Sequence, residues 1–190
     1  AHMAALGCPT PSYTTVTVLT DKEEIGSVGN TGLSSAYLQF FVEDLAKTQG
    51  LEGRDVLRAS ECLSADVNAG VDPTFQSVHD KLNASFINRG IVVTKYTGAR
   101  GKSDTSDANA EFVGKLRKLF DDNDIVWQIG ELGKVDQGGG GTVAKYVAHL
   151  GVDVVDVGVP VLSMHAPFEQ IAKLDIYMAY KAFCAFYNQK

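Results

Sequence analysis

The segment VDVVDVGVPVL, residues 152–162, is the most apolar stretch of the chain and decides how the fold is built. Its first six residues are rich in β-branched side chains and predict a buried strand. The segment also contains Asp153 and Asp156, which excludes a bilayer span. Helical spacing predicts one helix just before it, at residues 142–150, and another after it, at residues 168–186. This strand therefore belongs to a chain in which strands and helices alternate.

The same alternation continues toward the N-terminus. Apolar residues at helical spacing predict a helix at 34–47 and a second one from an N-cap at Asp107 to Phe120. Short apolar, β-branched runs predict strands at residues 14–19, 62–65, 91–96 and 126–129. This order predicts an α/β fold, a three-layer sandwich with a mixed, largely parallel central sheet flanked by helices. Ligands of such folds bind beyond the carboxyl ends of the strands.

The composition limits the classes of function. A chain of 190 residues with 45% hydrophobic residues can bury one full core, so one domain is expected. We interpret Ala1–Met3 as a cloning remnant and residues 4–190 as the domain. The formal charge of −6 and the pI near 5.1 argue against a nucleic-acid surface, which needs clustered Lys and Arg.

The cysteines and the hydropathy indicate the compartment. Cys8, Cys62 and Cys184 are an odd number, widely spaced, and form no CxxC pair, which suits a reducing compartment. The sequence contains no membrane span or export signal that we can identify. We therefore expect a cytoplasmic protein.

The segment DKEEIGS, residues 21–27, places two carboxylates where the first predicted strand ends. An isolated Glu pair is usually a solvated surface feature. At a strand end, however, successive side chains point to different sides, so one can bind a metal while the other faces a metal-bound water. Metal-assisted hydrolysis needs this division between a ligand and a proton acceptor.

Two more potential ligands follow other predicted strands. Asp66 lies in LSADVNAG, where a turn or N-cap aspartate is the alternative, and His165 lies in LSMHAPFE, where a structural histidine is the alternative. Together with the Glu pair they place Glu, Asp and His at three separate strand ends. This distribution is typical of a metal site at a sheet edge.

Glycine-rich segments suggest rival sites. RGKS, residues 100–103, is similar to the end of a phosphate-binding loop, but Tyr96 stands where that motif needs glycine. GSVGNTG, residues 26–32, does not fit GxGxxG and is better interpreted as a flexible loop. QGGGGT, residues 137–142, precedes a predicted helix, where free N–H groups could bind a peptide main chain or an oxyanion; a plain mobile loop is the alternative.

Five motifs in order carry a family resemblance: DKEEIGSVGNTG, SADV, KYTGARGKS, ELGKVDQGGGGT and VPVLSMHAPFE. They resemble the carboxy-terminal part of the catalytic domain of the bacterial M18 metalloaminopeptidases, relatives of aspartyl aminopeptidase and aminopeptidase I. The resemblance covers nearly everything from about Tyr13 onward. It implies a zinc-peptidase-like sandwich that is incomplete at its N-terminal side, a peptide substrate and a homo-oligomer.

The resemblance also implies roles for individual residues. Glu23 would be the general base that activates a metal-bridging water, and Glu24 would be a zinc ligand. Asp66 would bind the second zinc, and His165 would complete the shell of the first. Cobalt or manganese could substitute for zinc. The resemblance further implies three substrate-binding residues: Lys95 near the substrate side chain, and Gly140 and Thr142 near its backbone.

The match also has gaps. In the family a further histidine ligand, the aspartate that bridges both metals and an inserted dimerisation domain come from sequence upstream of DKEE. Some members have histidines where this chain has Ala69 and Asp72, which leaves selectivity for acidic substrates open. We therefore expect weak or no activity for this chain alone. A structural or oligomerising module with a vacant metal site is the alternative from another class, and nucleotide binding ranks third.

Overall fold

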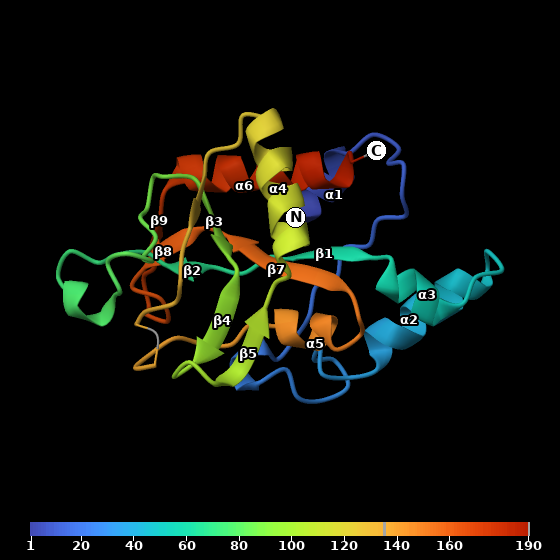
Figure 1. The fold of residues 1–190 in the computed structure, drawn as a ribbon, viewed down its shortest axis with the longest axis horizontal. Coiled ribbons are helices and arrows are strands. Elements are labelled where there is room, and N and C mark those ends of the chain that lie inside the picture. The colour runs from blue at the N-terminus through green and yellow to red at the C-terminus, as the bar shows by residue number, and fades with distance from the viewer. Residues whose placement is uncertain (135, 190) are drawn as a thin grey trace.

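A computed structural model, in which residues 1–134 and 136–189 are described, has a four-stranded central sheet (Figure 1). Val135, within the ELGKVDQGGGGT motif, and Lys190 lie outside the described residues. The strand order is β1-β7-β3-β6. The pairs β1·β7 and β3·β6 are parallel, whereas β3·β7 is antiparallel. The predicted mixed, largely parallel sheet is thus confirmed. The strands are β1 (Glu61–Ser64), β7 (Asp153–Gly158), β3 (Ile91–Thr94) and β6 (Trp127–Ile129).

Helices cover both faces of this sheet, as the three-layer prediction requires (Figure 1). One face packs against α4 (Ala110–Asp122) and α6 (Lys173–Tyr187), and α1 (His2–Gly7) lies against α6. The other face packs against α5 (Ala144–Ala148), with α2 (Tyr37–Lys47) and α3 (Gly53–Arg58) beyond it. Strand alternation separates the two cores, because Val155 and Val157 face α4 and α6 while Val154 faces α5.

Smaller elements surround the central sheet. They are η1 (Glu23–Ile25), β2 (Asn68–Ala69), η2 (Gln76–Val78), β4 (Tyr96–Ala99), β5 (Ser103–Asp107), β8 (Pro160–Leu162) and β9 (Gln170–Ile171). Strands β2, β8 and β9 form a three-stranded sheet, and β4 pairs with β5 as a hairpin. Because β1 and β7 are parallel, the segments that lead to Asp66 and to His165 leave the sheet in the same direction, whereas β3 runs antiparallel to β7 and leads to Lys95 in the opposite direction.

Several predicted boundaries were wrong. Residues 14–19, predicted as a strand, form no ladder with any described residue, because β-branched residues favour an extended chain but a strand also needs a neighbour. The helix predicted from Asp107 begins after Asn109, whose side chain accepts a hydrogen bond from Phe112 N at 2.7 Å, and Asp107 instead ends β5. The terminal helix begins at Lys173 rather than near 168, since β9 comes first.

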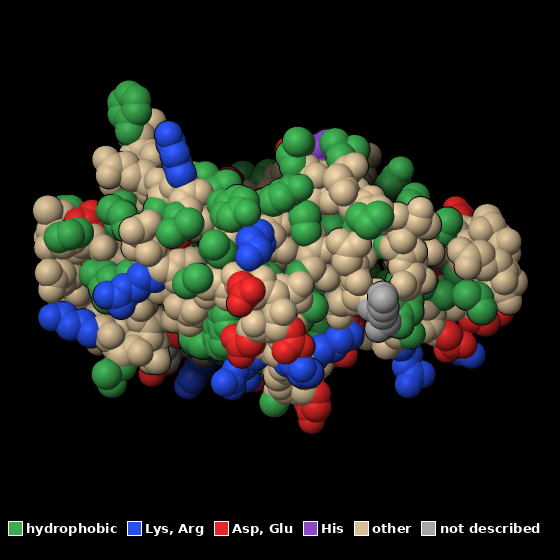
Figure 2. Space-filling view, turned by 90° about the horizontal axis from the view of Figure 1, so that it is seen from above, with side chains coloured by type: hydrophobic (Ala, Val, Ile, Leu, Met, Phe, Trp, Pro, Cys, Tyr) green, Lys and Arg blue, Asp and Glu red, His purple; other side chains and the backbone are tan. Residues whose placement is uncertain are grey.

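The N-terminal residues pack against the domain, and one face of the domain exposes apolar side chains. Residues 2 and 3, which we set aside as part of a cloning remnant, are helical, and Ala4 is fully buried against α6. Figure 2 looks onto the α4–α6 side and shows hydrophobic side chains spread over it, with charged groups gathered near the middle. Tyr177 and Tyr180 of α6 are among the exposed large hydrophobic side chains. Among the described residues, no helix has both the length and the apolar character to cross a membrane.

Candidate metal centre and its substrate side

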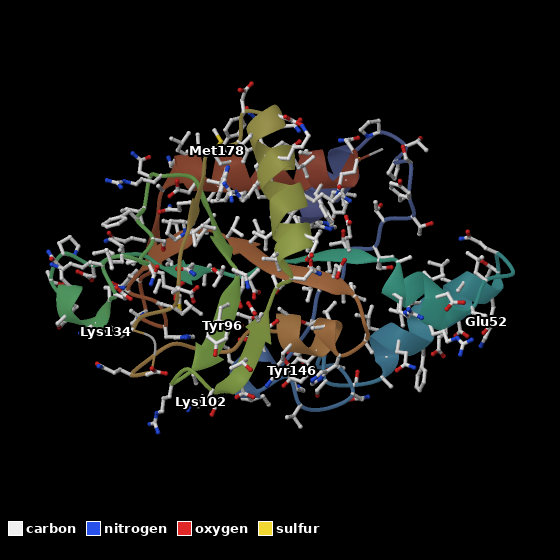
Figure 3. The ribbon with its side chains drawn as sticks, viewed as in Figure 1. Glu52, Tyr96, Lys102, Lys134, Tyr146 and Met178 are labelled. Atoms are coloured by element: carbon white, nitrogen blue, oxygen red, sulfur yellow. The ribbon has the colours of Figure 1, made fainter. Side chains whose placement is uncertain are left out.

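The Glu pair lies on a short, tightly held 3-10 turn. Lys22 before it and Gly26 after it both have left-handed backbone, with φ of 64° and 82°. Ser27 N donates to Lys22 O at 2.7 Å, which closes the turn. Tyr146 of α5, labelled in Figure 3, donates its hydroxyl to Gly26 O at 2.7 Å. These contacts hold the turn against the rest of the domain, with Glu24 exposed and Glu23 half-buried.

His165 reaches the same place from the segment between β8 and β9. Its backbone is left-handed, with φ of 67°, and its N–H donates to Glu169 Oε1 at 2.6 Å. Its Nδ1 atom lies 3.7 Å from Glu24 Oε2, with both side chains well exposed. The structure therefore brings together Glu24 and His165, which are 141 positions apart in the chain.

Asp66 follows β1, and its carboxylate accepts a hydrogen bond from Val67 N at 2.7 Å. Its backbone passes directly over Gly158, the last residue of β7. A Cβ atom at position 158 would lie 1.3 Å from Asp66 O, so only glycine permits this approach. The carboxyl end of β7 thus fixes where Asp66 leaves the sheet.

The acidic groups of this cluster influence one another. Burial, followed by the charges of Asp66 and Glu24, raises the pKa of Glu23, while His165 opposes this shift. Burial is also the main cause that raises the pKa of Asp66, and Glu24 adds to it. Such mutual repulsion in one small region favours the binding of a cation.

The cluster has a buried neighbour that the sequence analysis missed. Asp156 of β7 is only 6% exposed and accepts hydrogen bonds from Ser64 Oγ at 2.5 Å and Thr142 Oγ1 at 2.9 Å. Burial raises its pKa to about 7, and the nearby Asp66 and Glu23 contribute to this rise. The available signal was an Asp between valines in the middle of the strand, in contrast to Asp153 at its exposed start, since a buried carboxyl needs partners.

The predicted substrate-binding residues lie on the neighbouring hairpin and glycine segment. Lys95 pairs with Asp107, and Gly140 O accepts a hydrogen bond from Gly98 N at 2.9 Å. Thr142 is buried, and its hydroxyl is already bonded to Asp156. Any contact of Thr142 with a substrate would therefore use its main chain.

The comparison with known proteins identifies the family. The model of the aminopeptidase I zinc metalloprotease family, M18, matches residues 5–187. The chain belongs to the M18 family. It is 48% identical over 186 residues to the "Probable M18 family aminopeptidase 1" of Borreliella burgdorferi, covering 95% of this chain and 41% of that protein. This M18 chain thus spans less than half the length of the relatives it matches.

Solved structures of M18 proteins have the same fold. The crystal structure of aminopeptidase I from Clostridium acetobutylicum matches with a TM-score of 0.91 and 44% identity, over 98% of this chain and 41% of that one. The M18 aminopeptidase structure from Thermotoga maritima matches with a TM-score of 0.86 and 43% identity, over 90% of this chain and 39% of that one. The predicted α/β class and family are therefore confirmed.

The donor groups of this M18 chain fit zinc in kind. Carboxylate and imidazole are normal zinc ligands, and two ligand atoms of one tetrahedral zinc lie about 3.4 Å apart, close to the 3.7 Å between Glu24 Oε2 and His165 Nδ1. Within residues 1–134 and 136–189, however, no group of three His, Cys, Asp or Glu side chains is placed to hold a metal ion. The described residues thus bring one pair of candidate ligands together, with Asp66 close enough for its pKa to respond to both.

The rival phosphate-loop interpretation of RGKS loses its structural basis. In the M18 fold, Arg100–Lys102 form the turn of the β4–β5 hairpin, with Lys102 near its tip (Figure 3). An antiparallel strand follows this turn, whereas a phosphate loop needs a helix.

Proposed function

We propose that this chain supplies the general base and part of the metal shell of a dinuclear zinc aminopeptidase, which removes amino-terminal residues from peptides. The observation that carries the proposal is the Glu24–His165 pair at 3.7 Å, with Glu23 and Asp66 close enough that the charges of this pair influence their pKa values. Relatives named as M18 aminopeptidases support the reaction class.

Each ligand has a distinct place in this proposal. Glu24 and His165 hold one ion, and Asp66 holds the other. The family resemblance assigns the remaining ligands, a histidine and a bridging aspartate, to sequence that precedes the DKEE motif in the longer protein. Zinc is the expected metal, and cobalt or manganese could take its place.

Glu23 acts as the proton acceptor. Bound zinc would acidify a water molecule and polarise the scissile carbonyl group. Glu23 is half-buried beside these ligands, and its raised pKa makes it a stronger base than a solvated glutamate. It takes the proton of the attacking water and can pass it to the leaving amine. The left-handed residues on both sides of η1 keep this carboxylate in place.

The substrate lies along the hairpin side of the cluster. Lys95 contacts the side chain of the terminal residue, and the main chain at Gly140 and Thr142 contacts the peptide backbone. Asp156 links these two sides, because it accepts hydrogen bonds from Thr142 and from Ser64, two residues before Asp66.

A zinc titration by calorimetry tests the ligand assignment on the 190-residue chain itself. We expect saturable binding that His165→Ala weakens at least tenfold. The control is His149→Ala, an exposed histidine at the end of α5 outside the cluster. Equal binding by the two variants, or no binding by any of them, would overturn the assignment.

Activity is tested in a parent chain designed for the purpose, in which this sequence follows the upstream segment of an M18 relative. Removing a bridging carboxylate weakens metal binding, so this chain alone should be weakly active or inactive. In the parent, Glu23→Gln should reduce kcat by at least a hundredfold with little change in zinc content. Full turnover by that variant would exclude Glu23 as the base.

The second candidate is a structural or oligomerising module with a vacant metal site. Large exposed apolar side chains, among them Phe40, Leu82 and Phe168, favour self-association. One structural match, at 24% identity, is described as the mApe1 dodecamer of S. cerevisiae. Sizing chromatography with and without EDTA separates the candidates: assembly that is unchanged by chelation, combined with absent zinc binding, favours the module.

A further inference from the structure

The hydroxyl group of Thr97, on β4, has no hydrogen-bond partner among the described residues. Thr97 is only 2% exposed, and its Oγ1 atom is fully enclosed. Buried hydroxyl groups in folded proteins are almost always hydrogen-bonded, to protein or to an ordered water, because an unsatisfied one is costly. This hydroxyl therefore needs a partner from outside the protein.

A small cavity is lined in part by Thr97. Its volume is about 10 Å³, which is the space that one water-sized molecule occupies. Its lining comes from the hairpin, from the segment after β6 and from the glycine run: Tyr96, Thr97, Gly98, Gly101, Glu131, Leu132, Gly138 and Gly139. The cavity is thus both small and polar enough to hold a single hydrogen-bonding molecule.

Glu131 is the acidic residue of the lining, and the hydroxyl of Tyr96, the other polar side chain beside Thr97, donates to Gly101 O. Glu131 is half-buried, and burial, with a smaller contribution from the charge of Asp107, raises the pKa of its carboxyl group to about 7, while Lys95 opposes the rise. Near neutral pH this carboxyl can therefore either donate or accept a hydrogen bond. A water molecule suits both forms, whereas a bound cation would need the ionised form.

The glycine segment closes the cavity against β4. Gly98 N donates to Gly140 O at 2.9 Å, and Arg100 N donates to Gly138 O at 2.8 Å. Gly139 has φ of 93°, and a Cβ atom there would lie 2.3 Å from Gly98 O. Figure 3 shows Tyr96 on this hairpin. The backbone contact leaves no room for a side chain, so whatever fills the cavity is held under the loop.

We propose that the cavity holds one long-lived water molecule, which joins the Thr97 hydroxyl to the Glu131 carboxyl and fixes residues 138–140 against β4. Thr97 and Glu131 are then positioning residues for the glycine segment. The water site stands independently of the peptidase activity. Only its consequence for substrate binding, through Gly140, rests on the proposed function.

The first test is the sign of the change in Tm of the 190-residue chain for Thr97→Val. If a water is bound, the variant removes one of its partners, and Tm should fall by about 2–4 °C. If the cavity is dry, the same variant removes an unsatisfied hydroxyl, and Tm should stay constant or rise, which would overturn the proposal. The control is Thr105→Val, the same chemical change at an exposed position on β5.

The second test observes the water directly by NMR. Cross-relaxation between a long-lived water and the Thr97 methyl or the Gly139 amide is expected in the wild-type protein and in Glu131→Gln, which keeps a polar carboxamide. It should disappear in Glu131→Leu and in Thr97→Val. Absence of the signal in the wild type would overturn the proposal even if a variant failed to fold.

Two further measurements separate the alternatives. Amide hydrogen exchange of Gly139 and Gly140 should accelerate in Thr97→Val, while the amide of buried Val93 keeps its protection. Equal acceleration at Gly139, Gly140 and Val93 would mean general destabilisation and would contradict a positioning role for Thr97. Tm should be the same in sodium, potassium and choline chloride. A Tm that depends on the cation would show that a metal ion, and no water, occupies the cavity.

Discussion

The buried carboxyl group of Asp156 makes the stability of the metal-free chain depend on pH. Its pKa is about 7 in the folded state, against 3.8 for a free aspartate. A raised folded-state pKa means that the folded protein binds the proton more tightly than the unfolded chain. The contribution of Asp156 to the unfolding free energy is therefore fully present below about pH 4 and is lost as pH rises toward 7.

The size of the effect follows from the shift. Over the full range it corresponds to about 4 kcal/mol, and between pH 5 and pH 8 to about 2–3 kcal/mol, since each pKa unit is worth about 1.4 kcal/mol. Asp156 is almost completely buried, so solvent screening reduces this value little. Asp156→Asn cannot ionise, and it keeps an oxygen that accepts from Ser64 or Thr142.

The assay is urea unfolding of the wild type and Asp156→Asn at pH 5 and pH 8, in EDTA, because bound metal would stabilise the ionised carboxylates. The variant should gain about 2–3 kcal/mol relative to the wild type over this range. Glu23 and Asp66 titrate in both proteins, and their contributions cancel to first order. Parallel curves for the two proteins, or a wild type that gains stability over the variant as pH rises, would refute the reasoning.

The other predictions concern the backbone that holds the site. Gly158→Ala should lower Tm by at least 5 °C and weaken zinc binding, because its Cβ would overlap Asp66 O; the control Gly114→Ala, on α4 where a Cβ meets nothing, should raise stability by about 0.5–1 kcal/mol. Tyr146→Phe should cost about 1 kcal/mol in urea unfolding and reduce zinc affinity measured by calorimetry, because it frees the turn after the Glu pair. Asn109→Ala should cost about 1 kcal/mol with unchanged zinc affinity, because it removes only the cap of α4. If Tyr146→Phe and Asn109→Ala reduced zinc affinity to the same extent, the local role of Tyr146 would be contradicted.

Local sequence patterns predicted the core elements of the fold well. The strands β1, β3, β6 and β7 and the helices α2, α4 and α6 all overlap the segments that the apolar spacing indicated, with ends that differ by up to five residues. The burial of these elements depends on the spacing of apolar residues only a few positions apart, and this spacing can be seen directly in the sequence. The segment at residues 14–19 has the same β-branched composition but no strand beside it, and pairing is a property of the whole fold.

The candidate site was predictable in its residue types but not in its geometry. Predicted strand ends and family motifs led to Glu23, Glu24, Asp66 and His165, and the structure places Glu24 beside His165. The strand-end argument for the Glu pair was wrong, because residues 14–19 form no strand. The left-handed backbone at His165 has only a weak local signature, since His adopts this conformation more often than most residues but far less often than Gly. Asp156 drew attention only as a charge in an apolar run, because its role depends on hydroxyl groups that lie far away in the sequence.

Sheet register explains how one buried carboxyl serves both sides of the site. Ser64 of β1 pairs with Asp156 of β7, and Thr94 of β3 pairs with Asp156 on its other side. Because the register fixes Ser64, Asp66 leaves the sheet two residues later, over Gly158. The second oxygen of Asp156 accepts from Thr142, where the glycine segment ends. A shift of one residue in either pair would turn Asp156 into the apolar core of α4 and α6 and separate it from Ser64 and Thr142. The antiparallel contact between β3 and β7 therefore matters for the candidate site, since it aligns the strand that carries Asp156 with the strand that leads to Lys95.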